Sequence, residues 1–196
     1  MIKINSFLNT FDIVVLAAGK GSRMKSATLS KPLHLLNGIT LIEYLLLNLP
    51  INNFNNKIAV VSPNYENIQS KINNIDNNFI YAVQNNPKGT GDALFQALKN
   101  LKSKYVLVVN ADAPLITQSS YLNLMKNHEN KKLTLSLIQD NLTDTIPGDY
   151  GIIEKSNDGN IKSIQEKSRI HYEFNNDNIP QFNVGVYCFD VNWLQD

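Results

Sequence analysis

The sequence predicts an α/β fold in which helices cover both faces of a mostly parallel sheet. Short, continuous apolar runs recur along the first two-thirds of the chain, as is typical of strands buried on both faces. Segments with helical spacing lie between these runs, and this alternation favours βαβ units. The chain has 196 residues, 43% of them hydrophobic, which is enough for one domain over residues 1–196 with a substantial core.

The elements of the first part follow in order. The predicted strands are residues 12–17, 57–61, 79–83, 105–110 and 133–139, and the predicted helices are residues 41–49, 65–73, 92–101 and 120–127. Thr40 and Glu43 have the spacing of a capping box at the start of the first helix. Pro50 is expected to close that helix.

The pattern changes after residue 140. Pro147-Gly148-Asp149 signals a turn, and residues 151–154 and 161–165 flank an Asp158-Gly159 turn typical of a hairpin. Residues 182–189 predict a further strand, and a helix begins near Trp193. We expect the hairpin region to form a substrate-facing wall beside the main sheet.

Composition excludes several classes. The net charge is +1, whereas nucleic-acid binding usually needs a strongly basic face. The single cysteine, Cys188, permits no internal disulfide, and its apolar surroundings favour a buried side chain over a nucleophile. No apolar run approaches the length of a membrane span, and the amino terminus lacks a signal-peptide pattern. We therefore expect a cytoplasmic protein with neither nucleic-acid nor membrane partners.

The first candidate motif is a glycine turn that follows the apolar run 13–16, with the sequence Leu16-Ala17-Ala18-Gly19-Lys20-Gly21-Ser22-Arg23-Met24. Glycines let backbone N–H groups approach phosphate oxygens closely, and four basic residues (Lys20, Arg23, Lys25 and Lys31) add positive charge. Met24 replaces the third glycine of a dinucleotide fingerprint, and the P-loop spacing is absent. The turn predicts a site for a polyanionic nucleotide.

Two further motifs follow predicted strands. Asp112 in Asn110-Ala111-Asp112-Ala113-Pro114 lies where open α/β sheets bind ligands, and its carboxylate suits Mg²⁺. The alternative is a turn Asp before proline. Gln84 precedes a loop ending in Gly89-Thr90-Gly91, and its amide can recognise the edge of a base. The alternative is a polar loop with Thr90 as the helix N-cap. Gly151, Glu166 and Asn183 carry weaker signals, typical also of exposed or turn residues.

Together these motifs resemble the sugar-1-phosphate nucleotidyltransferases. The resemblance rests on residues 16–24, Lys31-Pro32-Leu33-His34, Gln84 with Gly89-Thr90-Gly91, and Asp112 with Pro114-Leu115. It covers roughly residues 10–195. The chain looks most similar to the uridyltransferase domain of the bifunctional N-acetylglucosamine-1-phosphate uridyltransferase/glucosamine-1-phosphate acetyltransferase, as His34 and Tyr150-Gly151 indicate. The resemblance implies a Rossmann-like three-layer fold of the nucleotide-diphospho-sugar transferase type.

The resemblance also implies roles for individual residues. Catalytic roles fall to Arg23, Lys31 and Asp112, of which Asp112 would bind Mg²⁺. The nucleotide would be held by Leu16, Ala17, Ala18, Gly19, Lys31, Gln84, Gly89, Thr90, Asn110 and Ala111. The sugar would be held by Gly151, Glu166 and Asn183. The implied reaction joins UTP and N-acetylglucosamine 1-phosphate into UDP-N-acetylglucosamine and pyrophosphate, which supplies precursors of the cell envelope (peptidoglycan and lipopolysaccharide).

Further expectations concern the rest of the family's pattern. The family's second Mg²⁺ ligand and its β-helix acetyltransferase domain would lie beyond residue 196, so we expect an incomplete domain, a monomer and no acetyltransferase activity from this chain. Ala111 stands where the family usually carries glycine, and its methyl group is expected to slow turnover. Two alternatives stay open: a nucleotidyltransferase for another sugar phosphate or base, and a non-catalytic nucleotide-sugar-binding fragment.

Overall fold

The computed structural model describes residues 10–19, 29–133, 135–141, 151–165 and 181–196. Its contacts divide the chain into two compact units. The first consists of Met1–Ser136 and Tyr187–Asp196, and the second of Leu137–Val186. The expectation of one domain over the whole chain stays a prediction.

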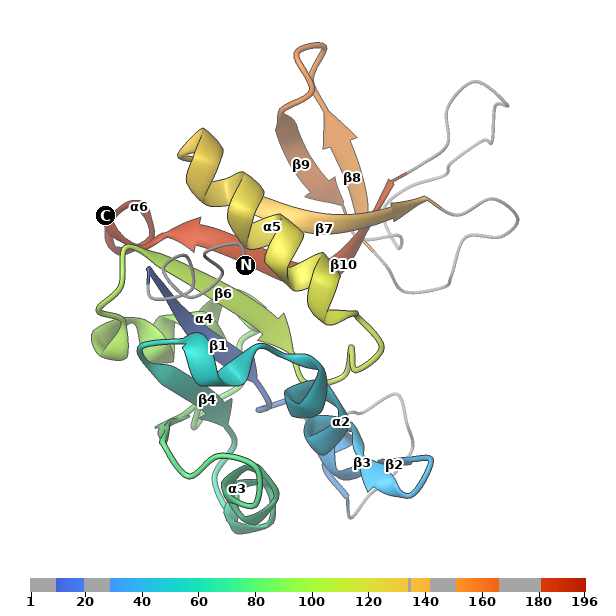
Figure 1. The fold of residues 1–196 in the computed structure, drawn as a ribbon, viewed down its shortest axis with the longest axis vertical. Coiled ribbons are helices and arrows are strands. Elements are labelled where there is room, and N and C mark those ends of the chain that lie inside the picture. The colour runs from blue at the N-terminus through green and yellow to red at the C-terminus, as the bar shows by residue number, and fades with distance from the viewer. Residues whose placement is uncertain (1–9, 20–28, 134, 142–150, 166–180) are drawn as a thin grey trace, which may run out of the picture. The chain divides into compact units, whose positions relative to one another are not determined.

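The sheet of the first unit has β1 (Phe11–Leu16) at its centre (Figure 1). On one side β1 pairs in parallel with β4 (Lys57–Val61), which pairs in parallel with β5 (Phe79–Val83). On the other side it pairs in parallel with β6 (Tyr105–Asn110). The order is therefore β5-β4-β1-β6, and β10 (Gln181–Asp190) is hydrogen-bonded next to β6. These four parallel strands lie within one residue of their predicted bounds.

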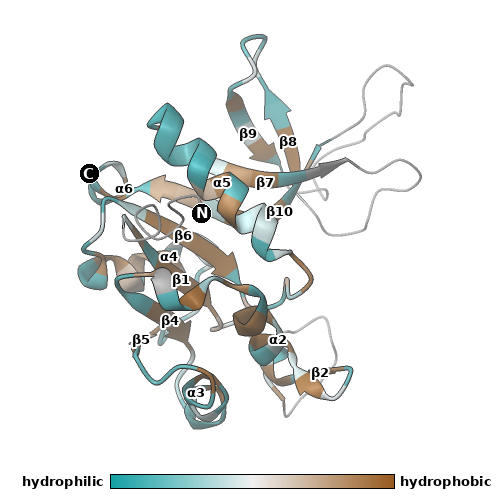
Figure 2. Ribbon diagram, in the orientation of Figure 1, coloured by the Kyte–Doolittle hydropathy of each residue, from teal (hydrophilic) through white to brown (hydrophobic). Residues whose placement is uncertain are grey.

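Helices cover both faces of this sheet, as predicted. Val14 and Val108 belong to one buried cluster with Ala93 and Leu94 of helix α4 (Thr90–Ala97). Because side chains alternate along a strand, the neighbouring residues point to the opposite face. There the ring of His128 from α5 (Gln118–Lys131) packs at steep angles, 62° and 90°, against the rings of Phe11 in β1 and Tyr105 in β6. Figure 2 shows the hydrophobic colour concentrated along β1, β4 and β6.

The predicted capping box is confirmed at the start of α2 (Leu41–Asn48). Thr40 Oγ1 accepts from the Glu43 N–H at 3.3 Å, and the Thr40 N–H donates to Glu43 Oε2 at 3.0 Å. Glu43 also accepts from Lys71 of α3 (Glu66–Asn73) at 3.3 Å, which ties the two helices together. The helix ends two residues before Pro50, as expected of a residue that cannot continue it.

Helices α4 and α5 differ most from their predicted bounds. Helix α4 begins two residues earlier than predicted and ends at Ala97, where a short 3-10 helix (Leu98–Asn100) takes over. Its N-cap is Gly89 rather than Thr90, which is the first helical residue. Helix α5 extends beyond its predicted span at both ends, from the Thr117 N-cap to a left-handed Lys132. The first and last turns of α5 consist mostly of polar residues, which carry no apolar periodicity from which the helix ends could be predicted.

A small hairpin was not predicted. Strands β2 (Leu35–Leu36) and β3 (Ile39–Thr40) pair antiparallel around Asn37 and Gly38, whose φ angles are +50° and +88°. Asn-Gly is the preferred pair for a two-residue hairpin turn with positive φ at both positions. The signal was therefore present in the sequence, although two-residue strands are too short for a periodicity argument.

Asp12 is a fully buried carboxylate at the start of β1. It accepts hydrogen bonds from the backbone N–H groups of Asn56, Lys102 and Ser103 at 3.0, 2.6 and 2.9 Å, and from Ser103 Oγ at 2.8 Å. These partners precede β4 and β6, the two neighbours of β1. A single side chain thus joins the starts of three strands.

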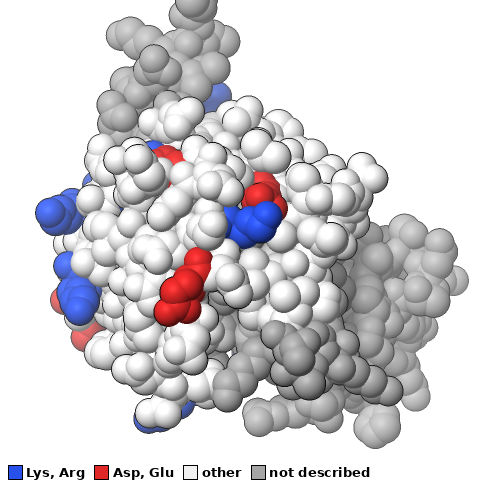
Figure 3. All heavy atoms as spheres, turned by 90° about the horizontal axis from the view of Figure 1, so that it is seen from below, with Lys and Arg blue, Asp and Glu red and all other residues white. Residues whose placement is uncertain are grey.

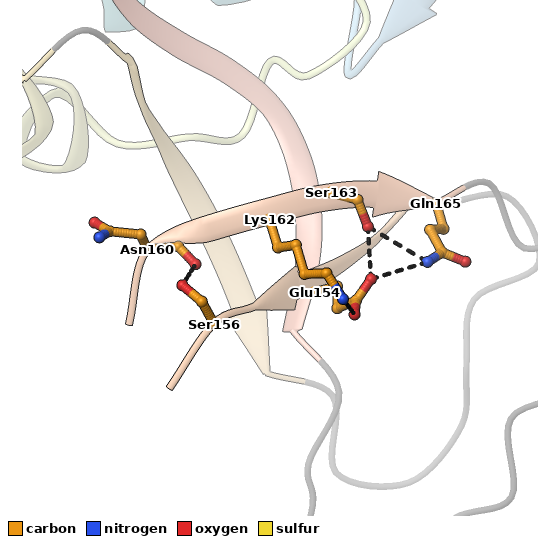
Figure 4. A network of polar contacts seen from close by, with 6 residues as sticks. All are labelled: Glu154, Ser156, Asn160, Lys162, Ser163 and Gln165. Atoms are coloured by element: carbon orange, nitrogen blue, oxygen red, sulfur yellow. Dashed lines mark hydrogen bonds and ion pairs between the residues drawn. The ribbon is translucent and has the colours of Figure 1, made fainter. Parts of the chain in front are cut away.

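The second unit contains the predicted hairpin. Strands β8 (Ile152–Lys155) and β9 (Ile161–Gln165) pair antiparallel, and the first residues of β10 pair antiparallel with β8. Gly159 has φ +82° at the turn. Figure 4 shows the Glu154 carboxylate facing Lys162, Ser163 and Gln165, which donate to it at 2.7, 2.8 and 3.1 Å. The hydrogen bonds from Lys162 and Ser163 hold the pKa of Glu154 below its usual value.

The last predicted elements are confirmed with small shifts. Strand β7 (Leu135–Asn141) pairs with β10, and α6 (Val191–Gln195) includes Trp193. Cys188 is buried in β10, and burial raises the pKa of its thiol. The predicted turn at residues 147–149 lies outside the described residues, and the predicted wall beside the main sheet stays a prediction.

Two surface properties complete the description. On the described part of the face in Figure 3, acidic and basic side chains lie scattered singly or in small groups, and they form no large patch of one charge there. Among the helices of the described residues, none has both the length and the apolar character needed to cross a bilayer.

Candidate active site

A pocket of about 370 Å³ lies in the first unit, where three loops leave the carboxyl ends of β1, β5 and β6. Its lining consists of Leu16, Ala18, Gly19, Lys31, Pro32, Gln84, Pro87, Gly89, Thr90, Ala93, Asn110, Ala111 and Asp112. The chain proceeds outward from β1 to β4 and β5, then returns to β6 on the other side of β1. Ligands of open α/β sheets bind in the crevice outside the strands at such a reversal.

Residues from the end of β1 form the floor of this pocket together with the end of β6. The Ala17 N–H donates to the Val60 carbonyl at 2.8 Å, so Ala17 extends the sheet and is absent from the lining. Its neighbours Leu16, Ala18 and Gly19 do line the pocket. The Ala111 N–H donates to the Leu16 carbonyl at 3.0 Å, which joins the two loops directly.

An ion pair forms one part of the pocket lining. Lys31 begins a short 3-10 helix (Lys31–Leu33) whose early proline presets its backbone. Lys31 Nζ lies 2.5 Å from Asp112 Oδ2, across 81 positions of sequence. Their side chains are 36% and 35% exposed. Both charges are therefore within reach of a ligand in the pocket.

Gln84 forms another part of the lining and is almost fully buried, with 4% exposure. Its backbone N–H donates to the Val61 carbonyl at 2.8 Å. Its side-chain Nε2 donates to Asp92 Oδ2 at 2.6 Å and to the Gly89 carbonyl at 3.3 Å. Hydrogen bonds thus hold both the backbone and the side-chain amide of Gln84 in place within the pocket wall.

The remaining predicted site residues lie elsewhere. Arg23 and Glu166 fall outside the described residues. Gly151 and Asn183 lie in the second unit, where the Asn183 N–H donates to the Gly151 carbonyl at 2.9 Å. A Cβ on Gly151 would come within 2.8 Å of the Ile164 side chain. Glycine at 151 therefore has a packing reason of its own.

Sequence reasoning missed four residues of this region. Pro32, Pro87 and Ala93 line the pocket, and Asp92 contacts Gln84. Pro32 and Pro87 stood inside motifs that were singled out for other members. Both Asp92 and Ala93 lie in the first turn of α4. The predicted helix began two residues too late to place this turn beside the pocket.

Comparisons with known proteins agree with this geometry. The sequence profile described as "Nucleotidyl transferase" matches residues 13–196, nearly the whole chain. The chain belongs to the nucleotidyl transferase family. It is 34% identical to the bifunctional protein GlmU of Acetivibrio thermocellus over 185 residues, and 32% identical to that of Limosilactobacillus fermentum over 179 residues. These matches cover 93% and 90% of this chain but 38% of each relative, so this nucleotidyl transferase spans under half the length of the relatives it matches.

Solved structures show the same nucleotidyl transferase fold. A CMP:2-keto-3-deoxy-manno-octonic acid synthetase complexed with CTP superposes with a TM-score of 0.73 at 15% identity, covering 95% of this chain and 76% of the other. A putative glucose-1-phosphate thymidylyltransferase from Bacillus anthracis gives 0.72 at 17% identity, covering 94% and 73%. The expected fold class is therefore confirmed.

Proposed function

We propose that this nucleotidyl transferase forms UDP-N-acetylglucosamine and pyrophosphate from UTP and N-acetylglucosamine 1-phosphate. One observation carries the proposal: a single pocket is lined both by a buried amide, Gln84, and by an ion pair of opposite charges, Lys31 and Asp112. The amide can form hydrogen bonds with a nucleobase. The ammonium group of Lys31 can bind phosphate oxygens, and the carboxylate of Asp112 can bind a metal ion. The choice of uracil and of the N-acetylated sugar rests on the resemblance to GlmU proteins.

The residues at Asp112 fit a bound Mg²⁺. Within the described residues, His, Cys, Asp and Glu side chains form no cluster of three or more that would make an all-protein cage. Mg²⁺ is commonly held by one or two carboxylates, with substrate phosphates and waters as its other ligands. Asp112 offers one such carboxylate in the pocket. When bound there, Mg²⁺ would neutralise charge on the phosphates.

The reaction requires positioning and charge neutralisation rather than a protein base. A phosphate oxygen of the sugar phosphate attacks the α-phosphorus of UTP; the bond to the bridging oxygen breaks, and pyrophosphate leaves with that electron pair. Phosphate is already a nucleophile at neutral pH. Lys31, together with Arg23, would hold phosphate oxygens in line and stabilise the charge of the transition state. Gln84, with Gly89 and Thr90, would hold the base.

Pyrophosphate release tests the proposal. The chain is incubated with Mg²⁺, one of the nucleoside triphosphates, and either N-acetylglucosamine 1-phosphate or glucose 1-phosphate. We expect release with UTP and the N-acetylated sugar above all other combinations. A preference for another sugar phosphate or base would favour a different nucleotidyltransferase. Binding of UTP without release in any combination would favour a non-catalytic nucleotide-sugar binder.

Asp112→Asn tests the metal ligand. The variant keeps the side-chain size but removes the negative charge, so we expect turnover to fall about 10²- to 10³-fold, as when one key electrostatic group is removed. Stability should change by less than about 1 kcal/mol, because the ion pair is partly exposed. Glu66→Gln, an exposed carboxylate on α3, is the matched control. Near-normal turnover of Asp112→Asn would reject the assignment.

A further inference from the structure

Asp92 is a polar residue of the pocket region that the proposed chemistry leaves without a role. It lies in the first turn of α4, beside the lining residue Ala93, and its carboxylate accepts from Gln84 Nε2 at 2.6 Å. This is the shortest hydrogen bond of the Gln84 side chain. The second acceptor of the same Nε2 is the Gly89 carbonyl at 3.3 Å.

The chemistry of these two acceptors determines how the Gln84 amide is turned. A carboxylate and a backbone carbonyl can only accept hydrogen bonds, so they must face the NH₂ group of the amide. The amide orientation, which is usually assigned from its surroundings, is therefore fixed on chemical grounds. Among the residues that the structure describes, none donates to Gln84 Oε1. The atom left for a ligand is an acceptor.

An acceptor at this position distinguishes two classes of base. Uracil presents an imino N–H on its hydrogen-bonding edge, as do thymine and guanine, whereas cytosine and adenine present a ring nitrogen that only accepts. Oε1 can accept from the first class but opposes a lone pair in the second. When a buried polar group of the pocket is left without a partner, the affinity for the ligand falls about tenfold or more. The turned amide thus favours a base with an imino proton.

We infer that Asp92 is a positioning residue that sets the base preference of the pocket by holding the Gln84 amide with its carbonyl oxygen toward the base. The inference rests on the proposed function in taking Gln84 as the group that meets the base. Asn in place of Asp92 would offer a donor as well as an acceptor. The Gln84 amide could then turn over, accept from the Asn side chain and donate to the ring nitrogen of cytosine. Only the longer contact with the Gly89 carbonyl, at 3.3 Å, would oppose this orientation.

Calorimetric binding of UTP and of CTP to the full chain, without sugar phosphate, tests the inference. Wild type should bind UTP more tightly than CTP. The ratio of the dissociation constant for CTP to that for UTP should fall about tenfold in Asp92→Asn. Glu66→Gln, which also removes a carboxylate from the first turn of a helix, should leave the ratio unchanged. Asp92→Ser, whose hydroxyl both donates and accepts, should lower the ratio too, and serves if the Asn variant does not fold.

Several results would overturn the inference. An unchanged ratio in both Asp92 variants, including an equal weakening of UTP and CTP, would make Asp92 merely structural. A wild-type chain that binds CTP at least as tightly as UTP, or binds neither, would also reject it. The chain could release no pyrophosphate and still bind UTP more tightly than CTP, with a preference that falls in Asp92→Asn. This result would uphold the inference while the proposed reaction fails.

Discussion

At Gly89 the backbone adopts φ +111° and ψ −178°, a combination that is essentially restricted to glycine. The same residue is the N-cap of α4, lines the pocket and presents its carbonyl to Gln84. Gly91, two positions later inside the helix, has no positive φ and has open space around its Cβ position. Two glycines of one short motif thus have different structural requirements.

Alanine substitutions at these two glycines should therefore have opposite effects. We expect Gly89→Ala to lower the free energy of unfolding by about 1–3 kcal/mol, because the new side chain strains the backbone. Gly91→Ala should leave it unchanged or raise it by up to about 1 kcal/mol, because alanine favours the helix. Urea unfolding of both variants measures the difference. A destabilised Gly91→Ala beside an unaffected Gly89→Ala would contradict the structure.

At the scale of elements, one carboxylate joins the starts of β1, β4 and β6. Asp12 is fully buried and satisfies three backbone N–H groups from the segments that enter β4 and β6. These donors come from residues 44, 90 and 91 positions away. Two of these strands, β1 and β6, lead to the pocket at their carboxyl ends. The carboxylate therefore supports the site from the opposite end of the sheet.

Asp12→Ala should leave the three N–H groups buried without an acceptor. We expect the free energy of unfolding to fall by about 2–4 kcal/mol, since each unsatisfied buried group is costly and partial rescue by water is expected. Asp12→Asn keeps one acceptor oxygen and should lose less. Urea denaturation followed by circular dichroism provides the comparison. Equal stability of wild type and Asp12→Ala would show that these hydrogen bonds contribute nothing net.

At the scale of the whole molecule, His128 links stability to pH. It is fully buried in α5, and its Nδ1 lies 2.8 Å from Ser136 Oγ. Burial lowers the pKa of His128 to about 4, while an unfolded histidine titrates near 6.5. Between these values the unfolded chain binds more protons than the native chain. The contribution of His128 to the free energy of unfolding is therefore fully present above about pH 6.5 and is lost as the pH falls toward about 4.

Unfolding at pH 7 and pH 5 tests this linkage. The free energy of unfolding of wild type should fall between these pH values by about 1–2 kcal/mol more than that of His128→Gln, which cannot titrate. Carboxyl groups titrate in both proteins and cancel in the difference. Parallel losses in the two proteins would show that His128 does not carry the pH dependence.

Local pattern alone predicted most of the fold. The continuous apolar runs located β1, β4, β5 and β6 because buried parallel strands leave little room for polar residues. The Thr40–Glu43 spacing located the start of α2 because a capping box is a contact within four residues. The ends of α4 and α5 were misplaced. The glycine cap of α4 has no polar side chain to mark the helix start, and the first and last turns of α5 are polar and so carry no apolar periodicity.

What the sequence by itself determined is therefore the set of elements and the motifs at the strand ends. The fold class followed from them, and they predict a site for a nucleotide, its phosphates and a metal. Only the tertiary structure decided which groups meet: Lys31 with Asp112, Asp12 with the entries to β4 and β6, and the Asp92 carboxylate with the Gln84 amide. The physical reason is range. Periodicity and capping act over a few residues, whereas a hydrogen bond depends on tenths of an ångström between segments that packing brings together.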